Sequence, residues 1–454
     1  MAADGWMEAA VRVAGDSGVQ IDRRRLRPGV NCYAVRSADG DALQFCFPLH
    51  LPFPLPEDID PRGADGAAWA VIEAVKRAAP GDPRLRPLGG LDTLHPGRYG
   101  AGIEPVTVMH LRSAAGADLW KADTDNYIGT DGLHCTVRGA VPWPGTPDNA
   151  AIRRLAEQVT DIAGGIADAG FRVPERRLRS AVTHLLDQTM LRERLHKLGL
   201  VAFIGDGTRP ARAYTRFRQH SRIAGPKDGV HIPFTCPDAL NPICLELPAS
   251  GRMVSGLSIR RGEALAVAGS NAAGKTTLLQ AILAGEDDHA PGDGRELLVT
   301  VPGARTAEAG GQHLHGADVS MFFSSLPPGM TGTPTSAFGQ GSGSMTMAMQ
   351  VGRAVREEAP LLLIDEDRAA ANLLVHSTLQ EEDVTPLSEI LSGQRHILGN
   401  TTLVLAASSL DPLIAQSDRI LVLRGHRADA ISPALFRGMY RDHLNRCLRL
   451  IGDV

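Results

Sequence analysis

Residues 269–277 carry the sequence feature that most constrains the fold of this chain, because they read Gly-Ser-Asn-Ala-Ala-Gly-Lys-Thr-Thr. In the pattern G-x-x-x-x-G-K-[ST] the glycines let the backbone curl so that successive N–H groups point at one anion. A mostly apolar run over 263–268 precedes the loop, as a buried parallel strand would, and an apolar helix is expected to follow from Thr276. Strand, loop and helix together predict a site for phosphate groups at the positive end of a helix.

The residues of this segment, which we call the phosphate loop, suit different parts of a nucleotide and its metal ion. Lys275 can reach the β- and γ-phosphates, and the Thr276 hydroxyl can coordinate Mg²⁺. ATP and Mg²⁺ are therefore the expected cofactors. The predicted phosphate-binding residues are Gly269, Ser270, Asn271, Ala272, Ala273, Gly274, Lys275, Thr276 and Thr277.

The composition narrows the class of protein. With 454 residues the chain can form two or three domains, and its net charge of −4 leaves no global excess of cations for nucleic acid. The six cysteines form no CxxC pair, which favours free thiols in a reducing compartment over a disulfide framework or a zinc site. The N-terminus lacks the basic and apolar regions of a secretion signal, and no apolar run approaches about 18 residues. We therefore expect a cytoplasmic protein without a membrane segment.

Residues 1–145 predict an N-terminal α/β or α+β domain. Apolar runs over 32–35 and 43–47 flank a hairpin signal, Asp39-Gly40, and a helix is expected over 66–78. Further strands are expected over 106–111 and 133–142. Because His110 and His134 lie among apolar neighbours in these strands, we interpret them as surface histidines rather than metal ligands.

Residues 146–227 predict a helical and linker region with a basic loop. Two long helices are expected, over 150–169 and from Pro174 to about residue 198, followed by a buried strand over 200–204. Between Asp206 and Asp228 the chain has no acidic residue and interleaves cations with aromatic side chains. The arginines of this basic loop that we single out are Arg209, Arg212, Arg216, Arg218 and Arg222.

The sequence of the basic loop leaves three interpretations open. Cations interleaved with aromatic rings suit contact with the backbone and bases of RNA or DNA. The same residues suit a loop that closes over the phosphates of a nucleotide. They also suit a solvated linker, since charged runs are often no more than that.

From about residue 228 onward the motifs resemble those of the ATP-binding cassette (ABC) ATPases. An Ile-x-x-Gly-Glu turn at 259–263 leads into the phosphate loop, and a later apolar strand ends in Asp365-Glu366. Residues Ser342, Gly343 and Ser344, which we call the signature turn, resemble the family's LSGGQ motif and begin 23 residues before Asp365. The resemblance implies an α/β P-loop NTPase core of the ABC type over 228–430, followed by a C-terminal helix over 431–454.

The resemblance also implies roles for these residues. Asp365 would hold Mg²⁺, and Glu366 would be the general base that polarises the attacking water. Adjacent carboxylates at the end of an apolar strand are unfavourable without a nearby cation, which supports this interpretation from the residues themselves. In the family the signature turn faces the phosphate loop of a second protomer. A head-to-tail, ATP-dependent homodimer is therefore implied, with Asn372 at the position of the family's interface aspartate.

Two departures from the cassette pattern concern turnover. The family's switch histidine should fall near Ser408, where this chain has no histidine, so fast hydrolysis is not implied. Gln312 is the candidate for the glutamine that couples Mg²⁺ to a partner. These departures point to a narrower family. The soluble "predicted ATPase of the ABC class" family is resembled over about residues 185–425 by the Asp187-Gln188-x-x-Leu191-Arg192 motif and by residues 291–296, 318–320, 342–344, 364–367 and 371–372.

We therefore predict an ATPase that hydrolyses Mg-ATP to ADP and phosphate at a composite dimer interface and is coupled to RNA or DNA binding. The alternative is an ATP-gated module for protein interaction or assembly with slow or no hydrolysis, which the missing histidine favours. A transporter cassette would need a membrane partner, and the large N-terminal region argues against it.

Overall fold

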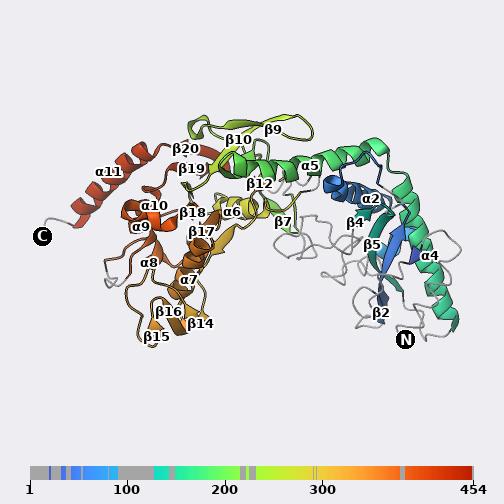
Figure 1. The fold of residues 1–454 in the computed structure, drawn as a ribbon, viewed down its shortest axis with the longest axis horizontal. Helices are drawn as coiled ribbons and strands as arrows, with labels where there is room; N and C mark the ends of the chain where they lie inside the picture. Colours follow the sequence, from blue (N-terminus) through green and yellow to red (C-terminus); the bar gives the residue numbers. More distant parts are fainter. Residues whose placement is uncertain are drawn as a thin grey trace.

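The computed structural model shows two halves of mixed α/β structure joined by one long helix, α5 (Glu175–Lys197) (Figure 1). In Figure 1 the N-terminal half lies on the right and the C-terminal half on the left. The predicted strand over 106–111 lies outside the described residues. The residues that the structure describes are 20–21, 32–36, 42–52, 55–79, 81–89, 127–142, 149–214, 221–223, 232–289, 291–292, 294–378 and 384–451.

The N-terminal half contains an antiparallel sheet of order β1-β3-β5-β4, with β2 also paired to β3. Strands β2 and β3 form the predicted hairpin, although its turn lies outside the described residues. The side chains of Phe45, Phe47 and Leu49 alternate along β3 and enter the first hydrophobic core. The strands are β1 (Gln20–Ile21), β2 (Tyr33–Arg36), β3 (Ala42–Leu51), β4 (Tyr127–Gly129) and β5 (Gly132–Pro142).

Helices cover this sheet and complete the first core. They are α2 (Ala64–Ala78), α4 (Asn149–Phe171) and the first half of α5, with the 3-10 turns η2 (Pro61–Gly63) and η3 (Pro83–Gly89). Helices α2 and α5 approach so closely at Gly66 that a Cβ there would lie 2.3 Å from the carbonyl oxygen of Ala181. Only glycine permits this contact.

Helix α5 belongs to both hydrophobic cores. Val182 and Leu185 in its first half pack in the N-terminal core, whereas Leu191 and Leu195 in its second half pack in the core of the other half. Because one continuous helix supplies side chains to two cores, the halves are connected by more than a flexible linker.

Polar side chains of the Asp187-Gln188-x-x-Leu191-Arg192 motif fix α5 to the C-terminal half. Asp187 accepts hydrogen bonds from the backbone N–H groups of Ala249 and Ser250 at 2.8 and 2.9 Å. Gln188 exchanges two hydrogen bonds with the backbone of His289, at 2.7 and 2.8 Å. Arg192 forms an ion pair with Asp288 at 2.8 Å. The motif therefore attaches α5 to the C-terminal half of the molecule.

The C-terminal half is built on a six-stranded sheet of order β13-β17-β18-β11-β19-β20. Its central strand, β11, runs parallel to β18 and β19 on its two sides, and β17 runs parallel to β18. Strands buried on both faces carry near-continuous apolar runs, as the sequence predicts for these segments. The strands are β11 (Ala264–Gly269), β13 (Arg305–Ala307), β17 (Leu361–Asp365), β18 (Thr402–Ala407), β19 (Arg419–Arg424) and β20 (Arg427–Ile431).

A second, antiparallel sheet of order β12-β6-β10-β9 packs in the same half. It consists of β6 (Leu200–Gly205), β9 (Ile243–Glu246), β10 (Met253–Arg260) and β12 (Leu298–Thr300). The apolar residues in Val230-His231-Ile232-Pro233-Phe234 predict a further strand, but this prediction is wrong for the described residues 232–234, which form no strand. Phe234 instead exchanges isolated backbone hydrogen bonds with Gly207 and Thr208, at 2.8 and 2.7 Å.

The basic loop contains a short hairpin that the sequence did not predict. Strand β7 (Arg212–Tyr214) pairs antiparallel with β8 (Ser221–Ile223). The basic loop therefore contains β structure in its described residues.

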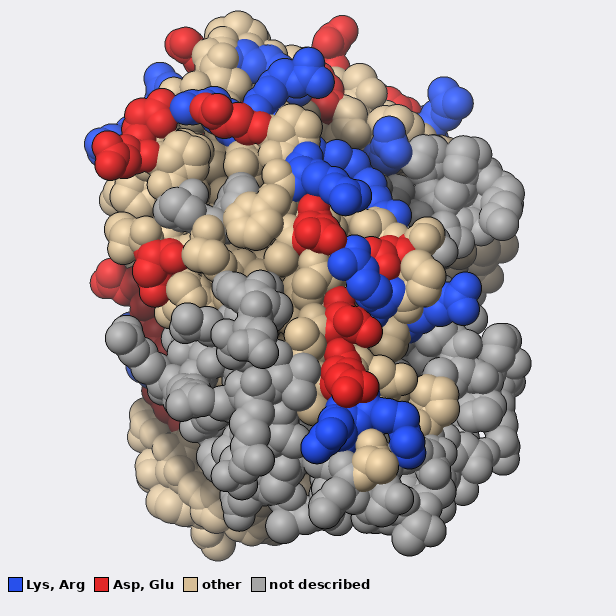
Figure 2. All heavy atoms as spheres, turned by 90° about the vertical axis from the view of Figure 1, so that its right-hand side faces the viewer, with Lys and Arg blue, Asp and Glu red and all other residues tan. Residues whose placement is uncertain are grey.

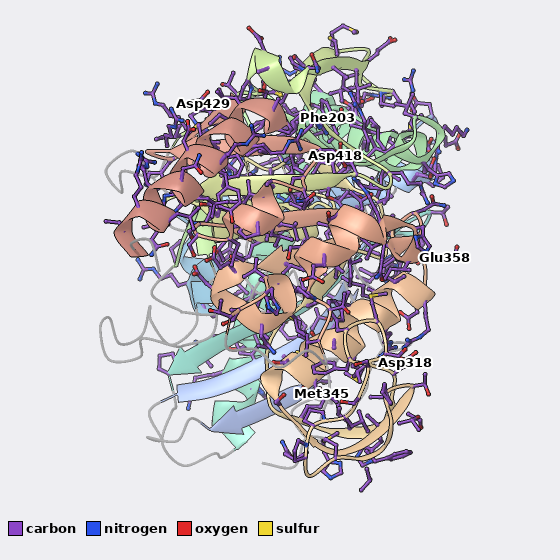
Figure 3. The ribbon with its side chains drawn as sticks, turned by 90° about the vertical axis from the view of Figure 1, so that its left-hand side faces the viewer. Phe203, Asp318, Met345, Glu358, Asp418 and Asp429 are labelled. Carbon is purple, nitrogen blue, oxygen red and sulfur yellow. The ribbon has the colours of Figure 1, made fainter. Side chains whose placement is uncertain are left out.

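The remaining elements form two features on the C-terminal half. A small antiparallel lobe of β14 (Gln312–Ala317), β15 (Thr331–Thr333) and β16 (Ser336–Gly341) leads into α7 (Gly343–Arg356). Figure 3 shows α7 between Met345, near its start, and Glu358, just beyond its end; Asp318 of the lobe forms an ion pair with Arg356 at 2.7 Å. Helix α11 (Pro433–Ile451) projects from the far side of this half (Figure 1).

Short helices complete the C-terminal half. They are α8 (Ala371–Leu374), α9 (Leu387–Gly393) and α10 (Asp411–Ile414). A bilayer-spanning helix would need a long apolar stretch, and none of the helices over the described ranges carries one.

Candidate functional site

The phosphate loop leaves the carboxyl end of β11 and enters α6 (Lys275–Ala284) with the backbone geometry that its glycines allow. Gly269 has φ 143° and lies so close to β19 that a Cβ would be 2.5 Å from the carbonyl oxygen of Leu423. Gly274, the N-cap of α6, has φ 102°. No side chain caps this helix, so its first N–H groups are directed at the loop interior without a side-chain acceptor.

Lys275 is buried at the start of α6, with 5% of its surface exposed. Its Nζ donates to the carbonyl oxygens of Gly269 and Ser270, at 2.9 and 3.0 Å. These contacts hold the ammonium group inside the loop, but they supply no opposite charge. A buried cation of this kind is well placed to bind a phosphate group.

Thr276 and Asp365 meet although 89 residues separate them in the sequence. Helix α6 packs against β17 and β18, which brings its first turn to the carboxyl end of β17. The Thr276 hydroxyl donates to Oδ2 of Asp365 at 2.6 Å. Asp365 is only 8% exposed and also accepts from the N–H of Asp367 at 3.3 Å.

The Thr276–Asp365 pair fits a Mg²⁺ ion. Neighbouring ligands of octahedral Mg²⁺ lie about 2.9 Å apart, because each oxygen is about 2.0–2.1 Å from the ion. The observed 2.6 Å between the hydroxyl and carboxylate oxygens needs only a small adjustment. Both groups are the hard oxygen ligands that Mg²⁺ prefers.

Glu366, which follows β17, is bound by the segment that follows the neighbouring strand β18. Its carboxylate accepts hydrogen bonds from the N–H groups of Ser408 and Ser409 and from the Ser409 hydroxyl. Burial alone would raise the pKa of Glu366, but these hydrogen bonds outweigh it and lower the pKa below its ordinary value. Glu366 is therefore held as a carboxylate, and its basicity is reduced.

A pocket of about 380 Å³ opens beside the phosphate loop. The residues that line it include Lys275 and Thr276 of α6 together with Phe234, Leu423 and His426. Neither Phe234 nor His426 belongs to a sequence motif that would mark it as a site residue. His426 occupies the β19–β20 turn with φ 65°, close to Gly274, and only the pairing of β11 with β19 brings it there.

The signature turn lies at the start of α7 and makes hydrogen bonds within its own chain. The Ser342 hydroxyl caps the helix by accepting from the N–H of Met345 at 3.4 Å. Ser344 donates to Oδ1 of Asn372 at 2.8 Å. A Cβ at Gly343 would lie 3.1 Å from Cβ of Ala309, so this glycine has little room to change.

The structure does not join the signature turn to the phosphate loop of the same chain by a hydrogen bond or ion pair between described residues. Gln312 pairs with Gly341 in the β14–β16 ladder, immediately before the signature turn. Asn372 lies in α8 and contacts Ser344. The predicted site residues therefore form two groups, one around α6 and one around α7.

The basic loop begins at the wall of the pocket. The N–H of Arg209 donates to the carbonyl oxygen of Gly294 at 2.6 Å, and the next two residues, Pro210 and Ala211, line the pocket. Arg212 and Arg222 lie on β7 and β8. Arg216 and Arg218 are outside the described residues.

Comparison with known proteins decides the family. The family model named ABC_ATPase, P-loop domain, matches residues 174–444. The chain belongs to this family. It is also 39% identical over 427 residues to an uncharacterized protein of Methanocaldococcus jannaschii, with 92% of each chain covered. Family membership confirms the expected α/β P-loop fold and supports nucleotide binding and ATPase activity at the level of the ABC_ATPase family.

Two solved structures share a fainter likeness with this member of the ABC_ATPase family. A metal-chelate type ABC transporter in an inward-facing conformation is 13% identical, with 52% of this chain and 84% of the other covered and a TM-score of 0.30. A bacterial Atm1-family ABC exporter with ATP bound is 15% identical, with 66% and 54% covered and a TM-score of 0.31. At these scores neither likeness bears on how the present chain works.

Proposed function

We propose that the chain binds Mg-ATP in the pocket beside α6 and hydrolyses it to ADP and phosphate at an interface between two copies of itself. The observation that carries this proposal is the Thr276 hydroxyl 2.6 Å from Asp365, beside the buried ammonium group of Lys275. An anion-binding loop, a buried cation and two hard oxygen ligands are the groups needed to bind a nucleoside triphosphate with its Mg²⁺ ion.

In this mechanism each residue has a separate task. Lys275 moves from the carbonyl oxygens of Gly269 and Ser270 to the β- and γ-phosphates. Thr276 and Asp365 would hold Mg²⁺, which neutralises charge that develops on the phosphates. Glu366, whose carboxylate is held by the segment after β18, would orient the attacking water through an acceptor site that these hydrogen bonds leave available.

A second copy of the chain would complete the site. The Ser342 side of the signature turn is exposed at the N-terminus of a 14-residue helix, where N–H groups and a hydroxyl suit a γ-phosphate. The lack of a connection to the phosphate loop of its own chain favours contact with the phosphate loop of a partner. Asn372 would sit at this interface because it contacts Ser344.

The basic loop is the proposed link between nucleotide and nucleic acid. It starts at Pro210 and Ala211 on the pocket wall and carries Arg212 and Arg222 on adjacent strands. The arginine-rich face of α5 is a weaker candidate. Figure 2 shows mixed acidic and basic side chains on the N-terminal half, and Arg179 is paired with Asp58 and Glu175 at 2.7 and 2.6 Å.

A second candidate function is an ATP-gated interaction module with slow or no hydrolysis. The observation that favours it is the carboxylate of Glu366, which Ser408 and Ser409 hold by hydrogen bonds where the family has a cationic histidine. Serine hydroxyls cannot supply positive charge to a γ-phosphate. ATP binding and dimerisation could then proceed while hydrolysis stays slow.

The test measures ATP turnover with and without single-stranded RNA and DNA at several salt concentrations. We expect nucleic acid to stimulate turnover, and we expect its binding to weaken with salt because phosphate contacts release counterions. Replacing Arg212, Arg216 and Arg218 together by Glu should abolish both effects, whereas Arg176→Glu, on the exposed face of α5, should not. Unchanged salt-dependent binding in the triple variant would reject the nucleic-acid role. ATP binding without turnover under all conditions would favour the second candidate.

A further inference from the structure

We propose that the N-terminal half binds a divalent transition-metal ion, best matched by Zn²⁺, between His50, Asp131 and His134. One potential ligand atom from each of these residues lies within 4.8 Å of the other two. No other group of three or more His, Cys, Asp or Glu residues meets this criterion among the residues that the structure describes. The proposal does not rest on the nucleotide site, which belongs to the other half of the molecule.

Strand pairing brings the two histidines together. His50 on β3 is directly opposite His134 on β5, so both side chains lie on the same face of the sheet. Their rings stack with centroids 4.5 Å apart. Tyr127 on β4 is paired with His134 from the other neighbouring strand, and these two rings also stack, with centroids 4.6 Å apart. The His134 ring is therefore held in place by aromatic neighbours.

Asp131 lies in the turn between β4 and β5 and is directed at both histidines. Its Oδ1 is 2.9 Å from Nε2 of His134, and its Oδ2 is 3.8 Å from Nε2 of His50. Its carbonyl oxygen lies 3.0 Å from the same His50 nitrogen. In a tetrahedral site with bonds of about 2.0–2.1 Å, ligand atoms are about 3.3 Å apart. The two nitrogen–carboxylate distances bracket that value.

The ligand set selects the class of ion. Two imidazoles and one carboxylate suit Zn²⁺ and related transition metals, whereas Mg²⁺ and Ca²⁺ prefer sites built mainly of oxygen. The side chain of His134 is 8% exposed, that of His50 22% and that of Asp131 58%. An ion would thus reach the site from the Asp131 side and keep a position open for water.

The prediction that His134 is a surface histidine is wrong, because the residue is buried. It is only 6% exposed as a whole residue. The sequence shows His50 and His134 separated by 84 positions, and only the β3–β5 register reveals them as neighbours. An ion there would connect β3, β5 and the β4–β5 turn, and so stabilise the N-terminal half.

The test uses the untagged full-length chain, stripped of metal by a chelator and then dialysed against Zn²⁺ in slight excess over the chain, with Mg²⁺ in much larger excess. Elemental analysis should find one tightly bound Zn²⁺ per chain, and added Zn²⁺ should raise the Tm. Co²⁺ in its place should give the visible absorption of a four-coordinate site. His50→Gln and Asp131→Asn should each weaken Zn²⁺ binding about tenfold or more.

Two control variants remove other potential zinc ligands. His313→Gln combined with His315→Gln removes a histidine pair with ring centroids 4.6 Å apart, and Cys447→Ser removes a thiol 3.5 Å from His443. Both controls should retain the bound Zn²⁺. The Tm of each metal-free variant shows whether it folds, and His50→Gln, at a half-buried position, is the main test. A wild-type chain without Zn²⁺, or binding that survives His50→Gln and Asp131→Asn, would overturn the proposal.

Discussion

The phosphate loop and the signature turn both precede a helix, yet their N-termini are satisfied differently. Helix α6 starts at Gly274 without a side-chain cap, whereas the hydroxyl of Ser342 caps α7. Ser344 also donates to Asn372. The first N-terminus is open to an anion, while the second is closed by side chains of its own chain. For the proposed composite site we therefore expect an order of events, in which ATP would bind one phosphate loop before a partner's signature turn exchanges its internal hydrogen bonds for the γ-phosphate.

The largest expected effect is on the phosphate loop itself. Lys275→Ala should weaken ATP binding about 10–100-fold or more, since a charge-assisted hydrogen bond contributes about 1.5–3 kcal/mol. Isothermal titration with Mg-ATP measures this effect. Lys197→Ala, at an exposed position in the last turn of α5, is the matched control and should bind ATP normally. Equal ATP affinity in wild type and Lys275→Ala would contradict the assignment of the site.

A smaller and separable effect is expected on the signature turn. Ser342→Ala should leave the ATP affinity of the monomer unchanged but weaken ATP-dependent dimerisation about tenfold, because it removes a γ-phosphate donor and a helix cap worth about 1 kcal/mol. Sedimentation at a series of protein concentrations measures the dimer dissociation constant. Loss of ATP binding by the monomer would show instead that this turn contributes to the nucleotide site of its own chain.

The closed state of the signature turn can be measured through Ser344 and Asn372. Ser344→Ala and Asn372→Ala should be non-additive in the free energy of unfolding, with a coupling of about 0.5–1.5 kcal/mol for their hydrogen bond. Urea unfolding of both single variants and the double variant without nucleotide completes this cycle. Additive effects would mean that the turn is already open in the absence of a partner.

The smallest expected effect concerns the pH dependence of hydrolysis. A base must be deprotonated to act, so turnover falls as the pH drops through its pKa. Burial raises the pKa of Glu366, but hydrogen bonds from Ser408 and Ser409 outweigh this effect and lower the pKa overall. The fall in turnover is therefore expected at a pH below the ordinary pKa of a glutamate. Ser409→Ala removes one of these hydrogen bonds and should move the acid limb of kcat to higher pH. An identical pH profile in wild type and Ser409→Ala would separate Glu366 from the rate.

The sequence predicted the parts of the fold in which local pattern and burial agree. The apolar runs of β11 and β17 are buried on both faces, and the phosphate loop between strand and helix needs glycine at Gly269 and Gly274 for its backbone. These features are encoded within a few neighbouring residues. The strand expected over 230–234 failed because an apolar run alone does not show whether a partner strand is present.

The rest of the candidate site depends on contacts between distant segments. The bonds from Ser409 to Glu366 require β17 and β18 to be neighbours, and His426 reaches the pocket only through the pairing of β19 with β11. The sequence predicted helix α5 itself but not its packing in two hydrophobic cores, because its periodicity is continuous along the whole helix. These contacts depend on which strands are neighbours in the sheet, and the sequence of a single segment does not reveal this.

The most direct test of the composite site is the oligomeric state of Glu366→Gln, measured by light scattering with and without Mg-ATP. If ATP is bound between the phosphate loop of one copy and the signature turn of another, this variant should accumulate as a dimer with Mg-ATP and remain a monomer without it. Adding Lys275→Ala or Ser342→Ala to the same chain should reduce the dimer population. A monomer under every condition, with Mg-ATP bound at saturation, would contradict the composite site and leave the phosphate loop as a complete site within one chain.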